Sequence, residues 1–221
     1  MVKLLDILLK ISDAVLYMYE EKIDPLIIEA LESPYINLED IYEKGLNNGM
    51  LRAMEKLDNK EYFIPEIIVC ADTLNRGLSI IEKHGKLKEK DKGKILLAVV
   101  EGDTHDIGKN IVKIMLDAAG YEIIDLGANV NLDYIVDKAI EEKVDIIGLS
   151  SLMTSTMKGM GKVVNNVKNL DRKNKPKVII GGGPVTNRFC KKIGADGYSS
   201  NAPNAVKLVD NIVGWVQNEI N

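Results

Sequence analysis

The chain has little histidine and little cysteine, and both scarcities narrow the chemistry open to it. Only two of its 221 residues are histidine, His84 and His105. The two cysteines, Cys70 and Cys190, lie in separate halves without the spacing of a metal site or a disulfide framework. Two thiols are too few for a four-thiolate zinc or iron–sulfur centre, so we expect packed thiols and no independent zinc site.

Long apolar runs and an excess of positive charge are also missing. No apolar stretch approaches the roughly 20 residues that cross a membrane. An acidic residue, Asp6, stands where a signal peptide has its apolar centre. The formal net charge is −4, so no basic field favours nucleic acid or anionic lipid. We expect a cytoplasmic protein with no nucleic acid and no membrane among its partners.

The first part of the chain has the periodicity of amphipathic helices. Apolar residues recur at steps of three and four over residues 4–18, which lines one face of a helix. Asp24 and Pro25 predict the cap and the first residue of a short second helix. Residues 46–57 carry a third helical pattern, and a fourth begins at Pro65. Four such helices joined by short turns predict a small helical bundle.

A polar segment separates this bundle from the rest of the chain. Residues 83–93 are rich in lysine and bounded by glycine, which indicates an interdomain linker with a solvated, charged face. We expect His84, which lies in this segment, to be exposed to solvent. The sequence therefore predicts a helical domain over residues 1–88 and a second domain over residues 89–221.

The second domain alternates short apolar runs with helical patterns. The runs lie at residues 95–100, 123–124, 146–149 and 178–180, with a weaker one near Tyr198. Their length and apolar character are typical of strands buried on both faces. Alternation with helices predicts an α/β fold with a parallel, flavodoxin-like (Rossmann-like) sheet. Ligands of such sheets bind beyond the carboxyl ends of the strands.

Three loops with distinctive residues fall at those carboxyl ends. Asp103-Thr104-His105-Asp106-Ile107-Gly108 follows the first strand, Ser150-Ser151-Leu152 follows a later one, and Gly181-Gly182 the next. Taken alone, the first loop fits a polar turn in which Thr104 or Asp106 caps the following helix. The loop also contains His105, one of the two histidines of the chain, and this histidine could be a metal ligand.

The spacing of the three loops resembles that of one family. Cobalamin-binding domains of methionine synthases and of the corrinoid proteins in methanol and methylamine methyltransferase systems carry Asp-x-His-x-x-Gly, Ser-x-Leu and Gly-Gly at such intervals. The stretch Glu61-Tyr62-Phe63-Ile64-Pro65-Glu66 resembles the signature of the helical cap that precedes those domains. This resemblance implies a four-helix bundle cap before the cobalamin-binding domain. It also implies cobalamin or a related corrinoid as the cofactor, cycling between methyl-cobalt(III) and cobalt(I).

The resemblance assigns roles at the metal. His105 is implied as the lower axial cobalt ligand in place of the cofactor's benzimidazole, and imidazole is a suitable donor for cobalt. Asp103 is implied to accept the other ring N–H of that histidine. Thr156 stands where the family continues the relay with a hydroxyl, which is a serine in methionine synthases. The alternatives are a loop carboxylate for Asp103 and a helix cap for Thr156.

The resemblance also implies further contacts with the cofactor. Gly108 would let the backbone pass beneath the corrin ring, although helix–strand packing also explains a glycine there. Tight turns and caps are the alternative for the other positions. The remaining implied cofactor-binding residues are Thr104, Asp106 and Ile107 in the first loop, Ser150, Leu152 and Thr154 in the second, Gly181, Gly182 and Gly183 in the third, Tyr198 near the last strand, and Phe63 in the cap.

On this basis the chain is expected to be a methyl carrier. It would take a methyl group from a substrate-specific methyltransferase to a second methyltransferase, whose acceptor is tetrahydrofolate or a thiol. A reductive activation protein is a third implied partner. Such a chain is a non-autonomous subunit rather than a complete enzyme, since the cofactor carries the chemistry.

Three other functions share parts of the pattern. The small subunit of an adenosylcobalamin mutase has the same three loops, but the helical cap argues against it. A cobalamin-dependent sensor acting through protein contacts also fits. A flavodoxin-like FMN domain fits less well, because the first strand is not followed by a phosphate-binding loop rich in Ser, Thr and Gly.

Overall fold

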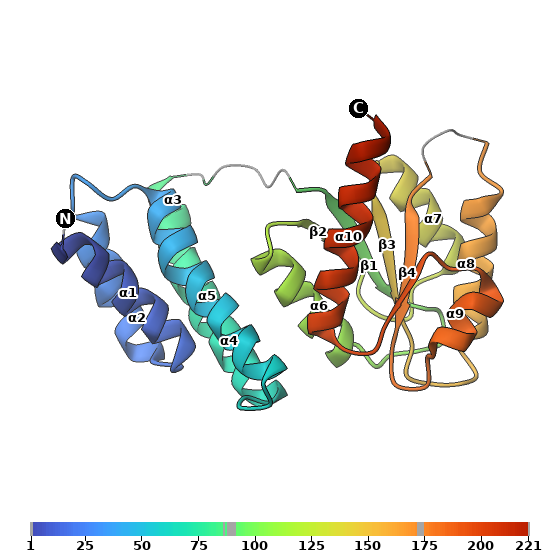
Figure 1. Ribbon diagram of the computed structural model, residues 1–221, viewed down its shortest axis with the longest axis horizontal. Coiled ribbons are helices and arrows are strands. Elements are labelled where there is room, and N and C mark those ends of the chain that lie inside the picture. The colour runs from blue at the N-terminus through green and yellow to red at the C-terminus, as the bar shows by residue number, and fades with distance from the viewer. Residues whose placement is uncertain (1, 86, 88–91, 172–174, 221) are drawn as a thin grey trace. The chain divides into compact units, whose positions relative to one another are not determined.

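The change of sequence pattern in the middle of the chain is matched by a change of architecture. The computed structural model describes residues 2–85, 87, 92–171 and 175–220. Its contacts divide the chain into two units, residues 1–89 and 90–221. The first unit contains only helices among its described residues, and the second contains a sheet with helices (Figure 1). The predicted combination of a helical bundle and an α/β domain is confirmed.

The helical unit is built from four helical segments. Its elements are α1 (Val2–Leu16), α2 (Glu20–Leu31), α3 (Leu38–Asp40), the π-helix η1 (Ile41–Asn47), α4 (Asn48–Asp58) and α5 (Ile64–His84). The elements α3, η1 and α4 follow one another without a break, so they form one segment. Ile11, Ile23, Leu46 and Ile67, one from each segment, are fully buried. Their burial provides the apolar core that holds the bundle together.

The second helix begins earlier than the sequence predicted. We expected Asp24 to cap it and Pro25 to occupy its first position, but α2 begins at Glu20 and includes Pro25 in its interior. Ile23 and Ile27, on either side of the proline, are both fully buried. Packing of this apolar face extends the helix across the proline, because tertiary contacts supply most of the stability of a short helix.

The second unit contains a five-stranded parallel sheet. Its strands are β1 (Lys94–Val99), β2 (Glu122–Asp125), β3 (Ile146–Ser150), β4 (Lys177–Gly181) and β5 (Gly197–Ser199), in the spatial order β2-β1-β3-β4-β5. The intervening helices are α6 (Ile107–Ala118), α7 (Leu132–Glu141), α8 (Lys158–Lys168), α9 (Asn187–Ile193) and α10 (Ala202–Ile220). This order is that of the flavodoxin-like fold, as predicted.

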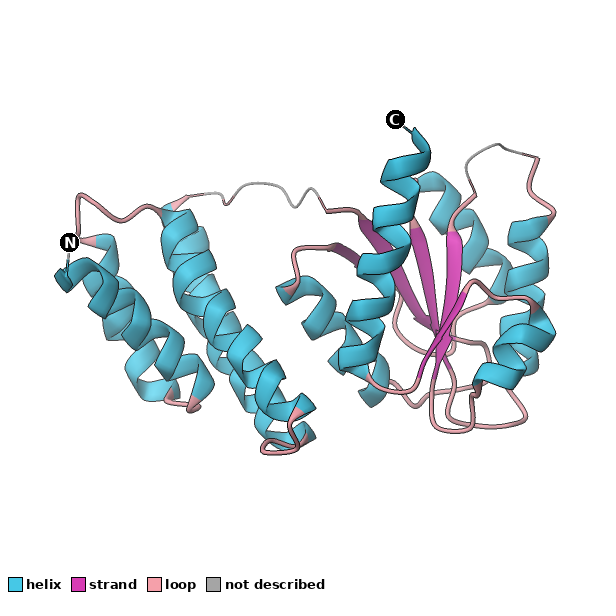
Figure 2. Cartoon of the chain, viewed as in Figure 1, coloured by secondary structure: helices cyan, strands magenta, loops and turns pink. Residues whose placement is uncertain are grey.

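Helices cover both faces of this sheet (Figure 2). Along β1, Leu96 and Ala98 belong to the apolar cluster formed with α7, α8 and α9. Ile95 and Leu97, which alternate with them, belong to the cluster formed with α6 and α10. Successive side chains of a strand point to opposite faces, so a continuous apolar run is what a two-sided core requires.

The strand order reverses between β1 and β3, and this reversal sets the position of the site. β1 pairs with β2 on one side and with β3 on the other. The chain leaves these two central strands in opposite directions, which opens a crevice at their carboxyl ends. The loops at residues 100–106 and 151–157 follow β1 and β3 and therefore meet at this point.

The predicted linker is described only in part. Lys83 and His84 form the last turn of α5, and His84 is exposed as expected. Residues 86 and 88–91 lie outside the described part of the chain. Within the described ranges, no helix combines the length and the apolar character needed to cross a membrane.

Candidate functional site

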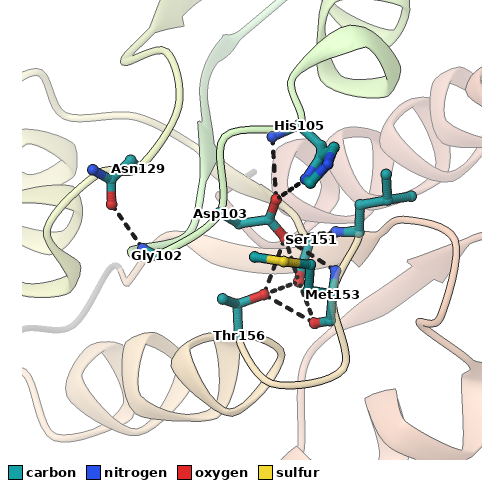
Figure 3. A network of polar contacts seen from close by, with 8 residues as sticks. Gly102, Asp103, His105, Asn129, Ser151, Met153 and Thr156 are labelled. Atoms are coloured by element: carbon teal, nitrogen blue, oxygen red, sulfur yellow. Dashed lines mark hydrogen bonds and ion pairs between the residues drawn. The ribbon is translucent and has the colours of Figure 1, made fainter.

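The site is organised around one buried carboxylate. Asp103 lies in the loop after β1, and its exposed fraction is 0%. Burial of a charged carboxylate is costly unless hydrogen bonds compensate for the lost water. Figure 3 shows that donors from two loops converge on this side chain.

Each carboxylate oxygen of Asp103 has its own set of donors. Oδ1 accepts from the ring Nδ1 of His105 at 2.8 Å and from the backbone N–H of the same residue at 3.1 Å. Oδ2 accepts from the backbone N–H groups of Leu152 at 2.8 Å and Met153 at 3.1 Å. Two backbone donors from the loop after β3 thus fix the carboxylate on the side opposite the histidine.

These contacts keep Asp103 ionised. Burial alone raises the pKa of this carboxyl, but hydrogen bonds from the His105 ring and from the backbone of His105, Leu152 and Met153 outweigh it. The net effect holds the pKa of Asp103 far below its ordinary value. A carboxylate rather than a carboxylic acid therefore faces the imidazole at neutral pH.

An ionised Asp103 fixes the tautomer of His105. The carboxylate can only accept, so Nδ1 of the ring carries the proton and donates it. In the neutral ring Nε2 then has the free lone pair, which is the arrangement of a metal-ligating histidine with a carboxylate behind it. The side chain of His105 is 50% exposed, so it remains partly accessible while Nδ1 is held by Asp103.

Two hydroxyls complete the network on the far side of Asp103. Thr156 Oγ1 lies 3.0 Å and Ser151 Oγ 3.1 Å from Oδ2, and the two hydroxyls lie 2.8 Å from each other. Thr156 does not cap a helix, because α8 begins at Lys158 after Met157. The predicted association of Thr156 with Asp103 is thus present in the structure.

Ser151 belongs to the network but was not selected from the sequence. Its side chain is fully buried, whereas Ser150, which the motif selects, ends β3 and is half-buried. The sequence signal that could have identified it is the pair of serines at the end of β3. Both serines have a hydroxyl, but only Ser150 fits the Ser-x-Leu motif. The backbone N–H groups of Leu152 and Met153 cannot be predicted from residue type, because almost every residue has one.

The start of α6 argues against the simpler interpretation of the first loop. Asp106 occupies the position before the helix but makes no capping hydrogen bond with its side chain. Its carboxylate instead accepts from the amide of Asn110 at 3.1 Å. Thr104 is exposed. The loop is therefore held by the Asp103 contacts rather than by a polar cap.

Two glycines of the motifs serve different needs. A Cβ on Gly108 would meet no atom within 4 Å, so the protein's own packing does not require a glycine there. Gly182 has φ +123°, and a Cβ on it would lie 1.9 Å from the carbonyl oxygen of Ser151. The chain itself therefore requires glycine at 182, while Gly108 leaves open space on the surface.

The other predicted site residues are spread over several environments. Two large apolar side chains beside the network are exposed, Ile107 at 67% and Leu152 at 51%. Thr154 is exposed, and Tyr198 is half-buried against the core on the α9 side. Phe63 precedes α5 in the helical unit and is 64% exposed. Gly181 and Gly183 flank Gly182 at the end of β4, where a Cβ on Gly181 would lie 3.3 Å from Ser199 O and one on Gly183 3.0 Å from a methyl of Leu152.

Family models match both units of the chain. A B12 binding domain matches residues 93–207, and a second model, also described as a B12 binding domain, matches residues 7–82. The first match includes all the loops of the Asp103 network.

Individual relatives match over nearly the whole chain. Dimethylamine corrinoid protein 3 of Methanosarcina acetivorans is 38% identical, over 89% of this chain and 92% of its own length. A chain in the methanol:cobalamin methyltransferase complex MtaBC from Methanosarcina barkeri has a TM-score of 0.85 at 28% identity, covering 95% of this chain and 80% of that one. A cobalamin-binding protein from Desulfitobacterium hafniense has a TM-score of 0.72 at 34% identity, covering 93% of this chain and 98% of its own.

Proposed function

Because the chain belongs to the family of B12-binding corrinoid proteins, we propose that it carries a methyl group on the cobalt of a bound corrinoid between two methyltransferases. Residues 1–88 are the cap in this proposal, and residues 89–221 are the binding domain. The corrinoid, when bound, supplies the metal on which the methyl group travels. The protein supplies the axial ligand, the seat of the ring and the docking surfaces.

The observation that carries the proposal is the state of His105. Its Nδ1 donates to a buried, ionised Asp103 at 2.8 Å, while the ring remains 50% exposed. His105 would supply the nitrogen through which the protein holds the cobalt of a bound corrinoid. The lone pair of Nε2 has the correct chemistry for that ligand.

The surface around His105 fits a large, mainly apolar ring. Ile107 and Leu152 expose their side chains beside the network. Gly108 adds no side chain between them and the solvent. Exposed apolar groups around a few polar ones are typical of a cofactor site. We propose that these residues lie under the corrin, and that the remaining predicted contacts in loops 150–154 and 181–183 receive its nucleotide tail.

The Asp103 network would control the proton on His105. While Nε2 is a ligand, Asp103 holds the proton at Nδ1. With that proton held at Nδ1, the lone pair of Nε2 stays directed away from the carboxylate. Ser151 and Thr156 donate to the same carboxylate and so set how strongly it attracts that proton.

The partners follow from what the relatives are named for. One relative is a dimethylamine corrinoid protein, and another belongs to a methanol:cobalamin methyltransferase complex. We propose a substrate-specific methyltransferase as the donor partner and a second methyltransferase, acting on tetrahydrofolate or a thiol, as the acceptor partner. A reductive activation protein would restore the carrier after oxidation. Phe63 and the start of α5 are proposed to shield the upper face of the cofactor.

Reconstitution with hydroxocobalamin tests the axial assignment. The absorption spectrum of wild type should show a histidine-ligated cobalt, and His105→Ala should lose those bands and bind the cofactor more weakly. His84→Ala is the matched control, since it removes the other histidine, which is exposed in the helical unit. Unchanged bands in His105→Ala would refute the assignment.

A second measurement separates methyl transfer from the alternatives. Protein loaded with methylcobalamin is mixed with methyltransferases encoded near it, and the loss of the methyl group is followed by absorbance. Transfer supports the carrier function. Failure with every such enzyme, together with normal cofactor binding, would favour a cobalamin sensor. Retention of adenosylcobalamin instead would favour a mutase subunit.

A further inference from the structure

The loop after β2 holds the His105 loop from a side that the family motifs do not include. Asn129 contacts the peptide unit before Gly102 and the peptide unit after Asp103. Its side-chain Oδ1 accepts from the backbone N–H of Gly102 at 2.7 Å, and its backbone N–H donates to the carbonyl of Asp103 at 2.8 Å. Figure 3 shows the first of these contacts beside the carboxylate network. One residue thus fixes the backbone on both sides of the Asp103 Cα.

The conformation of Asn129 makes this double contact possible. Its φ is +54°, in the left-handed region that most residues avoid and asparagine tolerates better than most. Gly102 has φ +85°. Because glycine adopts many backbone conformations, contacts with neighbouring residues are needed to fix the direction of the segment that begins there. Asn129 fixes the direction of this segment through its contacts with the backbone, and its side chain bonds to Gly102 rather than to the Asp103 carboxylate.

The far end of the Asn129 loop is anchored in the body of the domain. Asp125, the last residue of β2, accepts from the backbone N–H of Gly127 at 2.9 Å. The same carboxylate oxygen accepts from Lys109 Nζ at 2.6 Å, and the side chain of that lysine is 2% exposed. Because this lysine is nearly buried, separating the ion pair would leave its charge unpaired inside the protein. These contacts hold the loop that carries Asn129 in place.

We propose that Asn129 is a positioning residue for the axial ligand, an inference that rests on the proposed role of His105. It sets the direction in which the segment of residues 102–105 leaves β1. The loop after β3 holds the carboxylate of Asp103, whereas the loop after β2 holds its backbone carbonyl. A shift of that backbone would turn the carboxylate away from Nδ1 and rotate the ring that carries Nε2. Binding geometry at Nε2 thus depends on a residue that does not touch the histidine.

Three variants test the proposal in the full chain. Asn129→Gly keeps the left-handed backbone and its N–H but removes the acceptor for Gly102. Asn129→Asp keeps an acceptor at the same place. Lys143→Gly is the matched control, because Lys143 also has a positive φ, +54°, and is exposed before the amino end of β3, away from the site.

Two readouts of the hydroxocobalamin complex distinguish positioning from general stability. Asn129→Gly should weaken hydroxocobalamin binding about 10-fold, as changes behind a metal ligand commonly do, and should lower the fraction with histidine-ligated absorption. Asn129→Asp should stay within about twofold of wild type on both readouts, since it restores the hydrogen bond. Lys143→Gly should change neither, and thermal unfolding of the cofactor-free proteins should show similar small shifts for both glycine variants.

The outcomes separate this inference from the function on which it rests. If His105→Ala loses the ligated spectrum while Asn129→Gly binds and absorbs as wild type does, the positioning role is wrong and the axial assignment stands. If His105→Ala keeps the spectrum, both fail. If Asn129→Gly and Lys143→Gly weaken binding equally, the effect is a general loss of order, and the inference is overturned.

Discussion

The Asp103 network and the glycine loop lie at the same edge of the sheet but differ in which contacts constrain their residues. The network consists of Asp103, His105, Ser151 and Thr156, and hydrogen bonds to one carboxylate hold it together. In the glycine loop, residues 181–183, the backbone lies so close to Ser151 that a Cβ at 182 would be 1.9 Å from the Ser151 carbonyl oxygen.

Ser151 takes part in both arrangements. Its hydroxyl donates toward Asp103, while its carbonyl oxygen packs against Gly182. Steric contacts tolerate almost no change, because interiors are close-packed and atoms cannot overlap. Hydrogen bonds to a carboxylate with several donors can be lost one at a time. The difference implies that the glycine loop protects the fold, while the network can be tuned with smaller effects on stability.

The largest effect should follow from Gly182→Ala. The added Cβ clashes with backbone rather than with a side chain that can rotate, and φ +123° is unfavourable for any other residue. We expect a destabilisation of about 3 kcal/mol or more, as for other strained backbone sites. Thermal unfolding of the cofactor-free protein should show Tm lower by roughly 10 °C.

Gly108→Ala is the control that sharpens this comparison. A Cβ at that position meets open space, and the residue lies in the first turn of α6. Stability should stay equal or rise by up to about 1 kcal/mol, since alanine favours a helix over glycine. Hydroxocobalamin binding should nevertheless weaken about 10-fold if the ring lies over this position, because the methyl group would collide with it. Equal unfolding of both variants would contradict the distinction.

The next largest effect should follow from Asp103→Asn. The amide replaces one acceptor oxygen with an NH₂ group, which then faces N–H or O–H donors whichever way the side chain turns. We expect a loss of about 2 to 3 kcal/mol at pH 7, the range for unsatisfied buried groups. Urea unfolding at several pH values is the measurement.

The pH dependence of that difference has a definite sign. The pKa of Asp103 is lowered in the folded protein, so its contribution to stability is present above the unfolded-state pKa of about 3.9. It is lost as the pH falls from there toward the folded-state pKa. The gap between wild type and Asp103→Asn should therefore narrow as the pH falls below about 4. A gap independent of pH would contradict the assignment.

The sequence predicted the layers of the fold and the main residues of the network. Continuous apolar runs and helical patterns determine the alternation of strands and helices, and the parallel sheet follows from that alternation. His105, Asp103 and Thr156 were identified through the resemblance, and the structure brings them together. The start of α2 was predicted wrongly, because Pro25 is a strong local signal and the burial of Ile23 and Ile27 overrides it.

The contacts that the sequence could not supply depend on backbone geometry. The N–H groups of Leu152 and Met153 are donors in every residue type, so no letter in the sequence marks them. Asn129 lies 26 positions from Asp103, and only its left-handed φ and the folded loop reveal the contact. Ser151 was not selected because the Ser-x-Leu motif specifies Ser150 and leaves the next position open.

The smallest effect should follow from Thr156→Ala. The variant removes one hydroxyl, but Oδ2 of Asp103 keeps the backbone donors of Leu152 and Met153 and the hydroxyl of Ser151. A single hydrogen bond contributes about 1 kcal/mol, so urea unfolding should detect a loss of that size. Thr156→Ser keeps the hydroxyl and should recover most of it.

The same pair of variants shows whether the network tunes the ligand or only supports the loop. If it tunes the ligand, Thr156→Ala should alter the absorption of bound hydroxocobalamin while Thr156→Ser resembles wild type, because only the hydroxyl donates to the carboxylate behind His105. If Thr156→Ala instead destabilises the protein as strongly as Gly182→Ala does, the two regions do not differ in kind. Hydrogen bonding at Asp103 would then be as indispensable to the fold as the backbone contact at Gly182.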